Sequence, residues 1–153
     1  MEPGDRLPLD PFDVEVIPVA HSIPESTALA IRTPLGTVIH TGDWKIDETP
    51  IAGWKTDAAR LKIIGEEGVL ALICDSTNVM REGESLSEDD VAKGLSEVIS
   101  RADGRVAVTT FASNIARIRS IALAAKENGR EVVAIGKAMD RAIQVAIECG
   151  YLD

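Results

Sequence analysis

Two apolar runs that each end at an acidic residue constrain the fold of this chain more than any other feature. Residues 37–40 read TVIH and continue through Thr-Gly into Asp43, and residues 69–74 read VLALIC and continue directly into Asp75. Short apolar runs bounded by glycine and polar residues are typical of buried strands. A carboxylate at the end of a buried strand is costly unless a cation or hydrogen-bond donors meet it. What meets these acids is therefore the main question that the sequence raises.

The remaining hydrophobic periodicity predicts an α/β fold. We expect strands at residues 13–23, 29–32, 37–40, 69–74, 105–110 and 131–136. The second and third of these form a hairpin around a Thr-Pro-Leu-Gly turn. We expect helices at 58–65 after the capping residue Asp57, from Ser87 to about Ser100, at 113–127 and at 138–149. The last two strands alternate with the last two helices, which is typical of a doubly wound α/β unit.

Composition narrows the classes of partner. The 153 residues carry a net charge of −9 and only 3% aromatic residues. An acidic chain does not attract nucleic acid through its overall field but suits divalent cations, so any nucleic-acid contact is expected to be local. The two cysteines, Cys74 and Cys149, show no CxxC spacing, which favours a reducing cytoplasm. Neither a secretory leader nor an apolar run of about 18 residues is present, so we predict no membrane partner.

The candidate metal ligands are few. The chain has two histidines, His21 and His40, each following a strand-like segment. An imidazole and the carboxylate of Asp43 at adjacent strand ends are ligands that suit zinc or manganese. Taken singly, a histidine at a strand end is more often a hydrogen-bonded structural residue than a ligand, and a carboxylate after glycine commonly closes a turn. Two ligands do not hold a metal firmly, and no HxHxDH segment is present to complete the set.

Two further segments carry polar residues where a strand is expected to end. The sequence DSTN begins at Asp75, and its acid and amide are also explained by local turn or cap hydrogen bonds. The sequence FASN places Ser113 and Asn114 before a helix, whose free N–H groups are suited to a phosphate. No glycine-rich loop or GK[ST] segment accompanies it, so a helix cap without a ligand is the simpler interpretation.

Several segments together resemble one family. HSIPES, TPLGTVIHTGDWKID, GVLALICDSTN, SLSE, GRVAVTTFASNIARI and GREVVAIGKAM occur in this order over nearly the whole chain. They resemble the middle of the ribonuclease J family, which belongs to the β-CASP branch of the metallo-β-lactamase superfamily. HSIP followed by HTGD is the most specific pair.

The resemblance implies roles for the candidate residues. It makes His21 a metal ligand and Asp43 a carboxylate that bridges two cations, Zn²⁺ or Mn²⁺, whose charge offsets the cost of desolvating the acid. It makes Asp75 a catalytic acid that orients a histidine from elsewhere in the chain, and it places Ser113 and Asn114 near the RNA backbone. His40 matches no ligand position, so we expect it to support the site or to pack.

The resemblance also implies what lies outside these residues. The HxHxDH segment of the family would precede residue 1, and two later histidine motifs would follow residue 153. We therefore expect an internal fragment, with a partial metallo-β-lactamase-like sandwich at 1–82 and the start of a β-CASP α/β domain at 83–153. Exposed strand edges would favour a homodimer or homotetramer.

The implied function is that of a metal-dependent ribonuclease with endonuclease and 5′-to-3′ exonuclease activity on RNA. Two ions would generate a hydroxide and stabilise charge on the phosphodiester. We expect the isolated chain to be inactive and to bind metal weakly. The alternative is a non-catalytic fragment that acts as an interaction or assembly module. A thioesterase or lactonase of the same superfamily is disfavoured, because those enzymes lack the insert to which DSTN and FASN belong.

Overall fold

The computed structural model describes residues 2–153, which form two compact units. Unit 1 comprises the residues up to His21 together with Glu25–Glu48 and Gly53–Ser85. Unit 2 comprises Leu86–Asp153 and two short segments, Ser22–Pro24 and Thr49–Ala52. The expected α/β class is confirmed, since the chain combines five strands with four helices. The assignment of 1–82 and 83–153 to two named domains stays a prediction.

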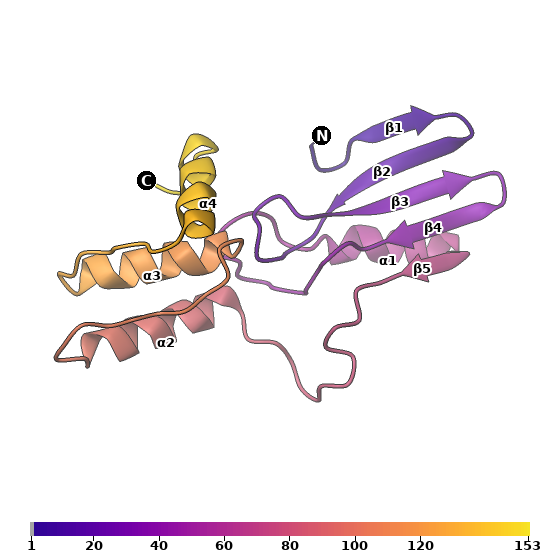
Figure 1. Ribbon diagram of the computed structural model, residues 1–153. Helices are drawn as coiled ribbons and strands as arrows, with labels where there is room; N and C mark the ends of the chain where they lie inside the picture. Colours follow the sequence, from indigo (N-terminus) through magenta and orange to yellow (C-terminus); the bar gives the residue numbers. More distant parts are fainter. Residues whose placement is uncertain (1) are drawn as a thin grey trace. The chain divides into compact units, whose positions relative to one another are not determined.

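Unit 1 contains a five-stranded sheet in the order β1-β2-β3-β4-β5 (Figure 1). The strands are β1 (Arg6–Leu9), β2 (Phe12–Pro18), β3 (Thr27–Thr33), β4 (Gly36–His40) and β5 (Ala71–Ile73). The first four pair antiparallel, and β4 pairs parallel with β5. The predicted hairpin is confirmed, with Thr33 opposite Gly36. Gly36 has a φ of +143°, and a Cβ there would lie 3.1 Å from the Leu70 side chain, so the turn requires glycine.

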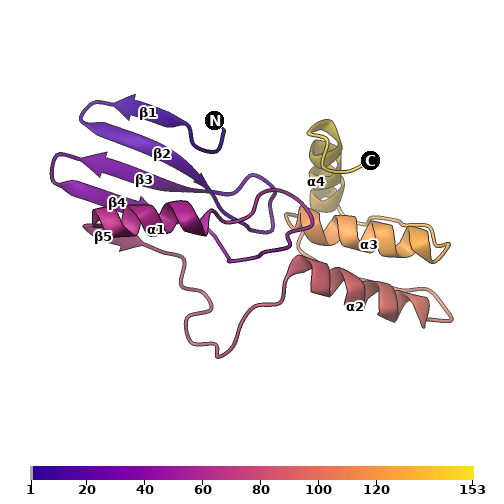
Figure 2. The ribbon, with the colours of Figure 1, turned by 180° about the vertical axis from the view of Figure 1, so that it is seen from behind.

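Helix α1 (Ala58–Glu67) lies against one face of this sheet (Figure 2). Its start is as predicted, because the Asp57 carboxylate accepts the Arg60 N–H at 2.8 Å. Ile64 of α1 is fully buried among apolar side chains of the sheet. The other buried residues of this core are Ile17, Ala28, Ala30 and Ile39 of the sheet and Val19, which follows β2. The two β3 residues of this core are both alanines, so larger side chains from β2, β4 and α1 supply most of its volume.

A buried carboxylate also lies between the sheet and α1. Glu15 is 5% exposed and accepts hydrogen bonds from Arg60, one of them 2.9 Å long from Nη2. The Arg32 Nη1 lies 2.8 Å from the same carboxylate. Hydrogen bonds from Arg60 outweigh the cost of burial and, with Arg32, lower the pKa of Glu15 to about 2. Glu15 thus joins β2 to β3 and α1 as a group that is ionised at neutral pH.

The prediction of a buried strand at residues 69–74 is partly wrong. Strand β5 covers only Ala71–Ile73, and its residues are exposed, with Leu72 at 60% and Ile73 at 54%. The physical reason is position, because β5 pairs on one side only, with β4, and forms an edge of the sheet. Apolar composition predicted the strand but not its place in the sheet. Strand β1, which the sequence analysis did not anticipate, forms the other edge.

Unit 2 is built from α2 (Glu88–Ser100), α3 (Ile115–Glu127) and α4 (Lys137–Glu148). All three helices were predicted to within two residues. Ser87 caps α2 through a 3.1 Å bond from the Asp90 N–H, as expected. Helices α2 and α3 pack together and are joined by an ion pair between Glu88 and Arg117 at 3.3 Å. These local signals were sufficient because caps and helical periodicity lie within short windows of sequence.

The two strands predicted in unit 2 are absent from the described residues. Residues 105–110 and 131–136 carry no strand, and Val133 and Ile135 are 80% and 88% exposed. Both segments are apolar enough for strands, but a strand also needs a neighbour that shares its backbone hydrogen bonds. No such ladder joins them within residues 2–153. The expected doubly wound unit is therefore wrong as a description of this part of the structure.

Candidate functional site

Asp43 and Asp75 lie in the loops that follow β4 and β5, at the carboxyl-terminal end of these two strands in unit 1. Strands β4 and β5 run parallel, with His40 opposite Ile73. The ladder continues one step further, where the Thr41 N–H donates to the Ile73 carbonyl at 2.9 Å. Because β4 and β5 run in the same direction, their carboxyl-terminal ends are neighbours, and the loops that carry Asp43 and Asp75 leave the sheet side by side. The sequence predicted an acid after each strand, but only the fold shows that β4 and β5 pair and bring the two loops together.

His21 follows β2 and lies at the same end of the sheet. Ala20 and Lys45 form an isolated bridge, and the Lys45 N–H donates to the Ala20 carbonyl at 2.9 Å. The Thr56 hydroxyl reinforces this bridge by accepting the Ala20 N–H at 2.9 Å and donating to the Lys45 carbonyl at 2.6 Å. The bridge sets His21 beside Asp43, with 3.7 Å between Nε2 and Oδ2. The predicted pair is thus brought together.

The pair fits part of a metal site. Zinc bonds to imidazole nitrogen and carboxylate oxygen are about 2.0–2.2 Å long, so two donors 3.7 Å apart can contact one ion. The side chains of His21 and Asp43 are 31% and 77% exposed, which leaves them open to an ion from solvent. No group of three His, Cys, Asp or Glu residues suited to a metal occurs among residues 2–153. Catalytic zinc takes three protein ligands, so a complete site would need at least one ligand in addition to His21 and Asp43.

Asp75 is held by its own turn. Its Oδ1 accepts hydrogen bonds from the Thr77 hydroxyl and from the Thr77 N–H, the latter at 2.9 Å. These two bonds, with a smaller contribution from the charge of His21, lower the pKa of Asp75. The acid is consequently ionised at neutral pH and suited to accept a hydrogen bond from a donor. Local bonding, which the sequence analysis treated as the simple alternative, is present.

His40 makes a local hydrogen bond rather than joining the pair. Its Nδ1 accepts the Gly42 N–H at 3.1 Å, so Nδ1 is unprotonated and a neutral ring carries its proton on Nε2. Gly42 has a φ of +60°, and a Cβ there would lie 3.2 Å from the Thr27 carbonyl oxygen. The sharp turn between β4 and Asp43 therefore depends on glycine at this position.

The residues predicted to contact RNA belong to unit 2. The Asn114 side chain caps α3, because its Oδ1 accepts the Arg117 N–H at 2.9 Å. Ser113 is exposed. The Ile115 N–H donates to the Ser22 carbonyl at 3.1 Å, so one of the backbone N–H groups at the start of α3 is already hydrogen-bonded. The cap interpretation is confirmed for Asn114, and contact with RNA stays a prediction.

Sequence reasoning missed the threonines that support the acids. Thr41 is 2% exposed, and its hydroxyl bonds to both loops at the strand ends. Asp47, 4% exposed with its carboxylate 2.9 Å from the Lys45 ammonium, was also missed. A threonine directly after an apolar strand is the available signal, because such hydroxyls commonly bond to nearby backbone groups.

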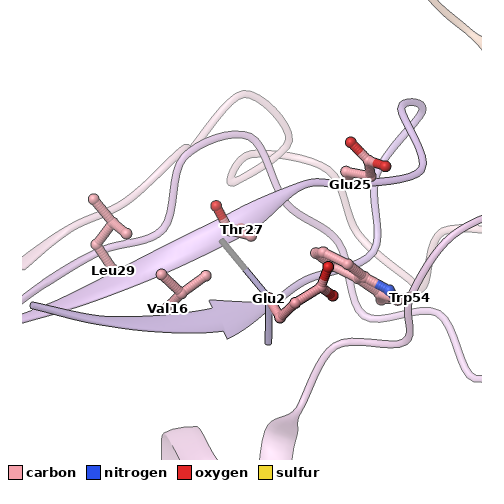
Figure 3. A pocket seen from close by; sticks show the side chains of 6 residues that line it. All are labelled: Glu2, Val16, Glu25, Thr27, Leu29 and Trp54. Carbon is pink, nitrogen blue, oxygen red and sulfur yellow. The ribbon is translucent and has the colours of Figure 1, made fainter. Parts of the chain in front are cut away.

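A pocket of about 300 Å³ lies elsewhere in unit 1 (Figure 3). It is lined by Glu2, Val16, Glu25, Thr27, Leu29 and Trp54. Val16 and Leu29 are cross-strand partners, and they alternate along their strands with the residues that face α1. The pocket therefore opens on the sheet face away from α1. None of His21, Asp43 and Asp75 lines it.

Residues 103–153 match the family described as Ribonuclease J, beta-CASP domain. The chain is 56% identical to the Ribonuclease J of Sinorhizobium meliloti over 150 residues, which are 98% of this chain and 27% of that protein. It is 46% identical to the Ribonuclease J of Thermus thermophilus over 153 residues, again 27% of that protein. The chain belongs to the ribonuclease J family and spans about 27% of the length of these two relatives.

A comparison with solved structures supports the fold. A crystal structure of a protein of unknown function from Enterococcus faecalis V583 matches with a TM-score of 0.59 and 18% identity. The match covers 90% of this chain and 38% of that one. None of the helices within residues 2–153 combines the length and apolar character needed to cross a membrane.

Proposed function

We propose that this chain is part of a metal-dependent ribonuclease that cleaves RNA internally and also degrades it from the 5′ end. The observation that carries the proposal is the His21–Asp43 pair, 3.7 Å apart at the edge of the sheet, in a chain 56% identical to a protein named Ribonuclease J. Membership of the family supports ribonuclease activity for the whole protein. Metal dependence and the two modes of cleavage are the finer parts of the proposal.

In this proposal His21 and Asp43 hold Zn²⁺ or Mn²⁺, with two ions in the complete site. Such ions supply a hydroxide nucleophile at neutral pH and stabilise negative charge on the phosphodiester. His21 would bind through a ring nitrogen whose lone pair is free to coordinate the ion. Asp75, whose pKa is lowered by the Thr77 hydrogen bonds, accepts a hydrogen bond from a histidine in another part of the whole protein. This hydrogen bond orients the histidine ring.

RNA is the proposed substrate, and the start of α3 in unit 2 is the proposed contact with its backbone. The exposed Ser113 and the positive end of the helix dipole favour a phosphate, while the Ile115 and Arg117 N–H groups are already bonded to the Ser22 carbonyl and the Asn114 side chain. Asn114→Asp separates this role from helix capping, since aspartate caps equally well but adds negative charge. We expect Asn114→Asp to weaken RNA binding and to leave helix stability unchanged. We also propose a cytoplasmic location and a homodimer or homotetramer, testable by sedimentation.

The function is tested in a chimera in which this chain replaces the matched 150 residues of the Sinorhizobium meliloti relative. A circular RNA reports internal cleavage, and a 5′-labelled linear RNA reports degradation from the end. We expect both activities to disappear with a chelator and to return with Zn²⁺ or Mn²⁺. Loss of groups that merely support metal ligands costs about 10- to 100-fold, so Asp43→Ala is expected to cost more than about 100-fold.

Glu48→Ala is the matched control, because Glu48 lies in the same loop with its side chain 80% exposed. Equal activity of the Asp43→Ala and parental chimeras would refute the proposed metal role. We expect the chain alone to be inactive and to bind Zn²⁺ weakly in calorimetric titration, since it offers two ligands where catalytic zinc takes three. A tight stoichiometric site in the chain alone, abolished by Asp43→Ala, would contradict that expectation.

A further inference from the structure

Thr41 lies at the point where β4 and β5 separate. In a parallel pair, a residue donates its N–H to one residue of the neighbouring strand and accepts, through its carbonyl, from the residue two positions further on. Thr41 makes the first of these bonds, to the Ile73 carbonyl at 2.9 Å. Regular pairing would next join the Asp75 N–H to the Thr41 carbonyl. The Asp75 N–H instead donates to the Thr41 hydroxyl at 3.2 Å. A side chain therefore replaces the main chain at the last step of the ladder.

The same hydroxyl has a second partner. It donates to the Gly42 carbonyl at 2.7 Å, directly before Asp43. Thr41 is 2% exposed, so water does not compete freely for these groups. A hydroxyl has one hydrogen to donate and lone pairs to accept, and both capacities are used here. One buried oxygen atom thus joins the backbone of Asp75 to the turn that leads into Asp43.

We propose that Thr41 is a positioning residue whose hydroxyl fixes the loops of Asp43 and Asp75 relative to each other. The proposal rests on the proposed function, in which these two acids serve phosphodiester cleavage. Asp43 is 77% exposed, and the Asp75 carboxylate bonds within its own turn, to Thr77. The placement of both side chains consequently depends on where their backbones are anchored.

Two substitutions separate the hydroxyl from the space that the side chain fills. Thr41→Val keeps the branched shape and removes the hydroxyl, whereas Thr41→Ser keeps the hydroxyl and removes the methyl group. Thr37→Val is the matched control, because Thr37 is a half-buried threonine within β4, four residues before Thr41. A role in filling space alone predicts that serine is the more harmful replacement at position 41.

The first measurement is amide hydrogen exchange at Asp75 by NMR in this chain. An intramolecular hydrogen bond contributes enough for about a five- to tenfold effect, so Thr41→Val is expected to speed exchange by that factor. Thr41→Ser and Thr37→Val are expected to leave it within about twofold. Unchanged exchange in Thr41→Val would overturn the proposal. A melting curve of each variant confirms that exchange is compared in folded protein.

The second measurement is ribonuclease kinetics in the chimera described above. Groups that orient a metal site typically change activity by about 10- to 100-fold, and we expect Thr41→Val to lower kcat by that factor with KM little changed. Thr41→Ser should restore kcat. Faster exchange at Asp75 with unchanged kcat would overturn the positioning role. An inactive parental chimera would instead refute the proposed function, while the exchange measurement would still decide whether Thr41 ties the two loops.

Discussion

The two units treat similar apolar segments differently. In unit 1, β2, β3 and β4 are paired over most of their length, and alternate side chains are buried against α1. In unit 2, residues 105–110 and 131–136 have comparable composition, yet they carry no strand and expose large apolar side chains. In unit 1, short hairpins join β1 to β2 and β3 to β4 and close at low entropic cost, while β4 and β5 pair although α1 lies between them. The two segments of unit 2 are also separated by a helix, but within residues 2–153 no strand pairs with either of them. Apolar composition alone therefore does not make a strand.

The largest expected effect comes from the core of unit 1. Ile64 of α1 is fully buried against the sheet, and removing such a side chain costs about 2–5 kcal/mol. We expect Ile64→Ala to lower the free energy of unfolding by that amount and to speed hydrogen exchange in β2, β3 and β4. Chemical denaturation with exchange measurements tests this. Ile63→Ala is the control, because Ile63 is 46% exposed on the same helix. Equal loss of exchange protection in α2 and α3 would break the distinction between the units.

The second effect concerns the ion-pair network of unit 1. The pKa of Glu15 is about 2 in the folded chain, below its usual 4.5. A lowered pKa contributes stability that is present above about pH 4.5 and is lost as pH falls towards about 2, and a shift of this size corresponds to about 3 kcal/mol. We expect Glu15→Gln to lose most of this stability at neutral pH and to flatten the acid limb of the curve.

Denaturation at several pH values measures this. Glu66→Gln is the control, since Glu66 is 69% exposed and lies 4.0 Å from Lys62. Exposed pairs of this kind contribute about 0–1 kcal/mol. An acid limb that is as steep in Glu15→Gln as in the parent would show that another group carries the pH dependence.

Helix caps test whether the two units differ in local chemistry. Asp57 caps α1 in unit 1 at 2.8 Å, and Asn114 caps α3 in unit 2 at 2.9 Å. Removing such a cap costs about 1 kcal/mol. We expect Asp57→Ala and Asn114→Ala to have similar effects on the stability of their own units. The replacements Asp57→Asn and Asn114→Asp keep a capping oxygen and should be close to neutral. A negligible effect in unit 2 alone would extend the difference between the units to their helices.

The smallest expected effect bears most directly on the unpaired segments. Ile135 is 88% exposed, so Ile135→Thr is expected to change stability by less than about 0.5 kcal/mol. Ile17→Thr is the comparison in unit 1, where the side chain is 1% exposed and a polar group would be buried. Thermal unfolding of both variants decides the matter. A large loss of stability in Ile135→Thr would mean that residues 131–136 are buried in the way a central strand is. The contrast between the two units would then disappear.

Much of the fold follows from short windows of sequence. The turn at Gly36 and the caps Asp57, Ser87 and Asn114 were readable because each signal acts within a few residues. The strands of unit 2 and the burial of β5 were not readable. Both depend on which segments pair, and one strand looks the same in sequence whether it lies at the centre of a sheet or at its edge.

The candidate site divides in the same way. The sequence by itself determined which chemical groups are available: an imidazole at His21 and acids at Asp43 and Asp75, each placed after an apolar run. Only the tertiary structure decided that His21 lies 3.7 Å from Asp43, and that a hydroxyl of Thr41 joins the two acidic loops. The physical reason is that residue type fixes what a group can bind. Its neighbours are set by pairing between segments far apart in the chain, here the Ala20–Lys45 bridge and the parallel register of β4 with β5.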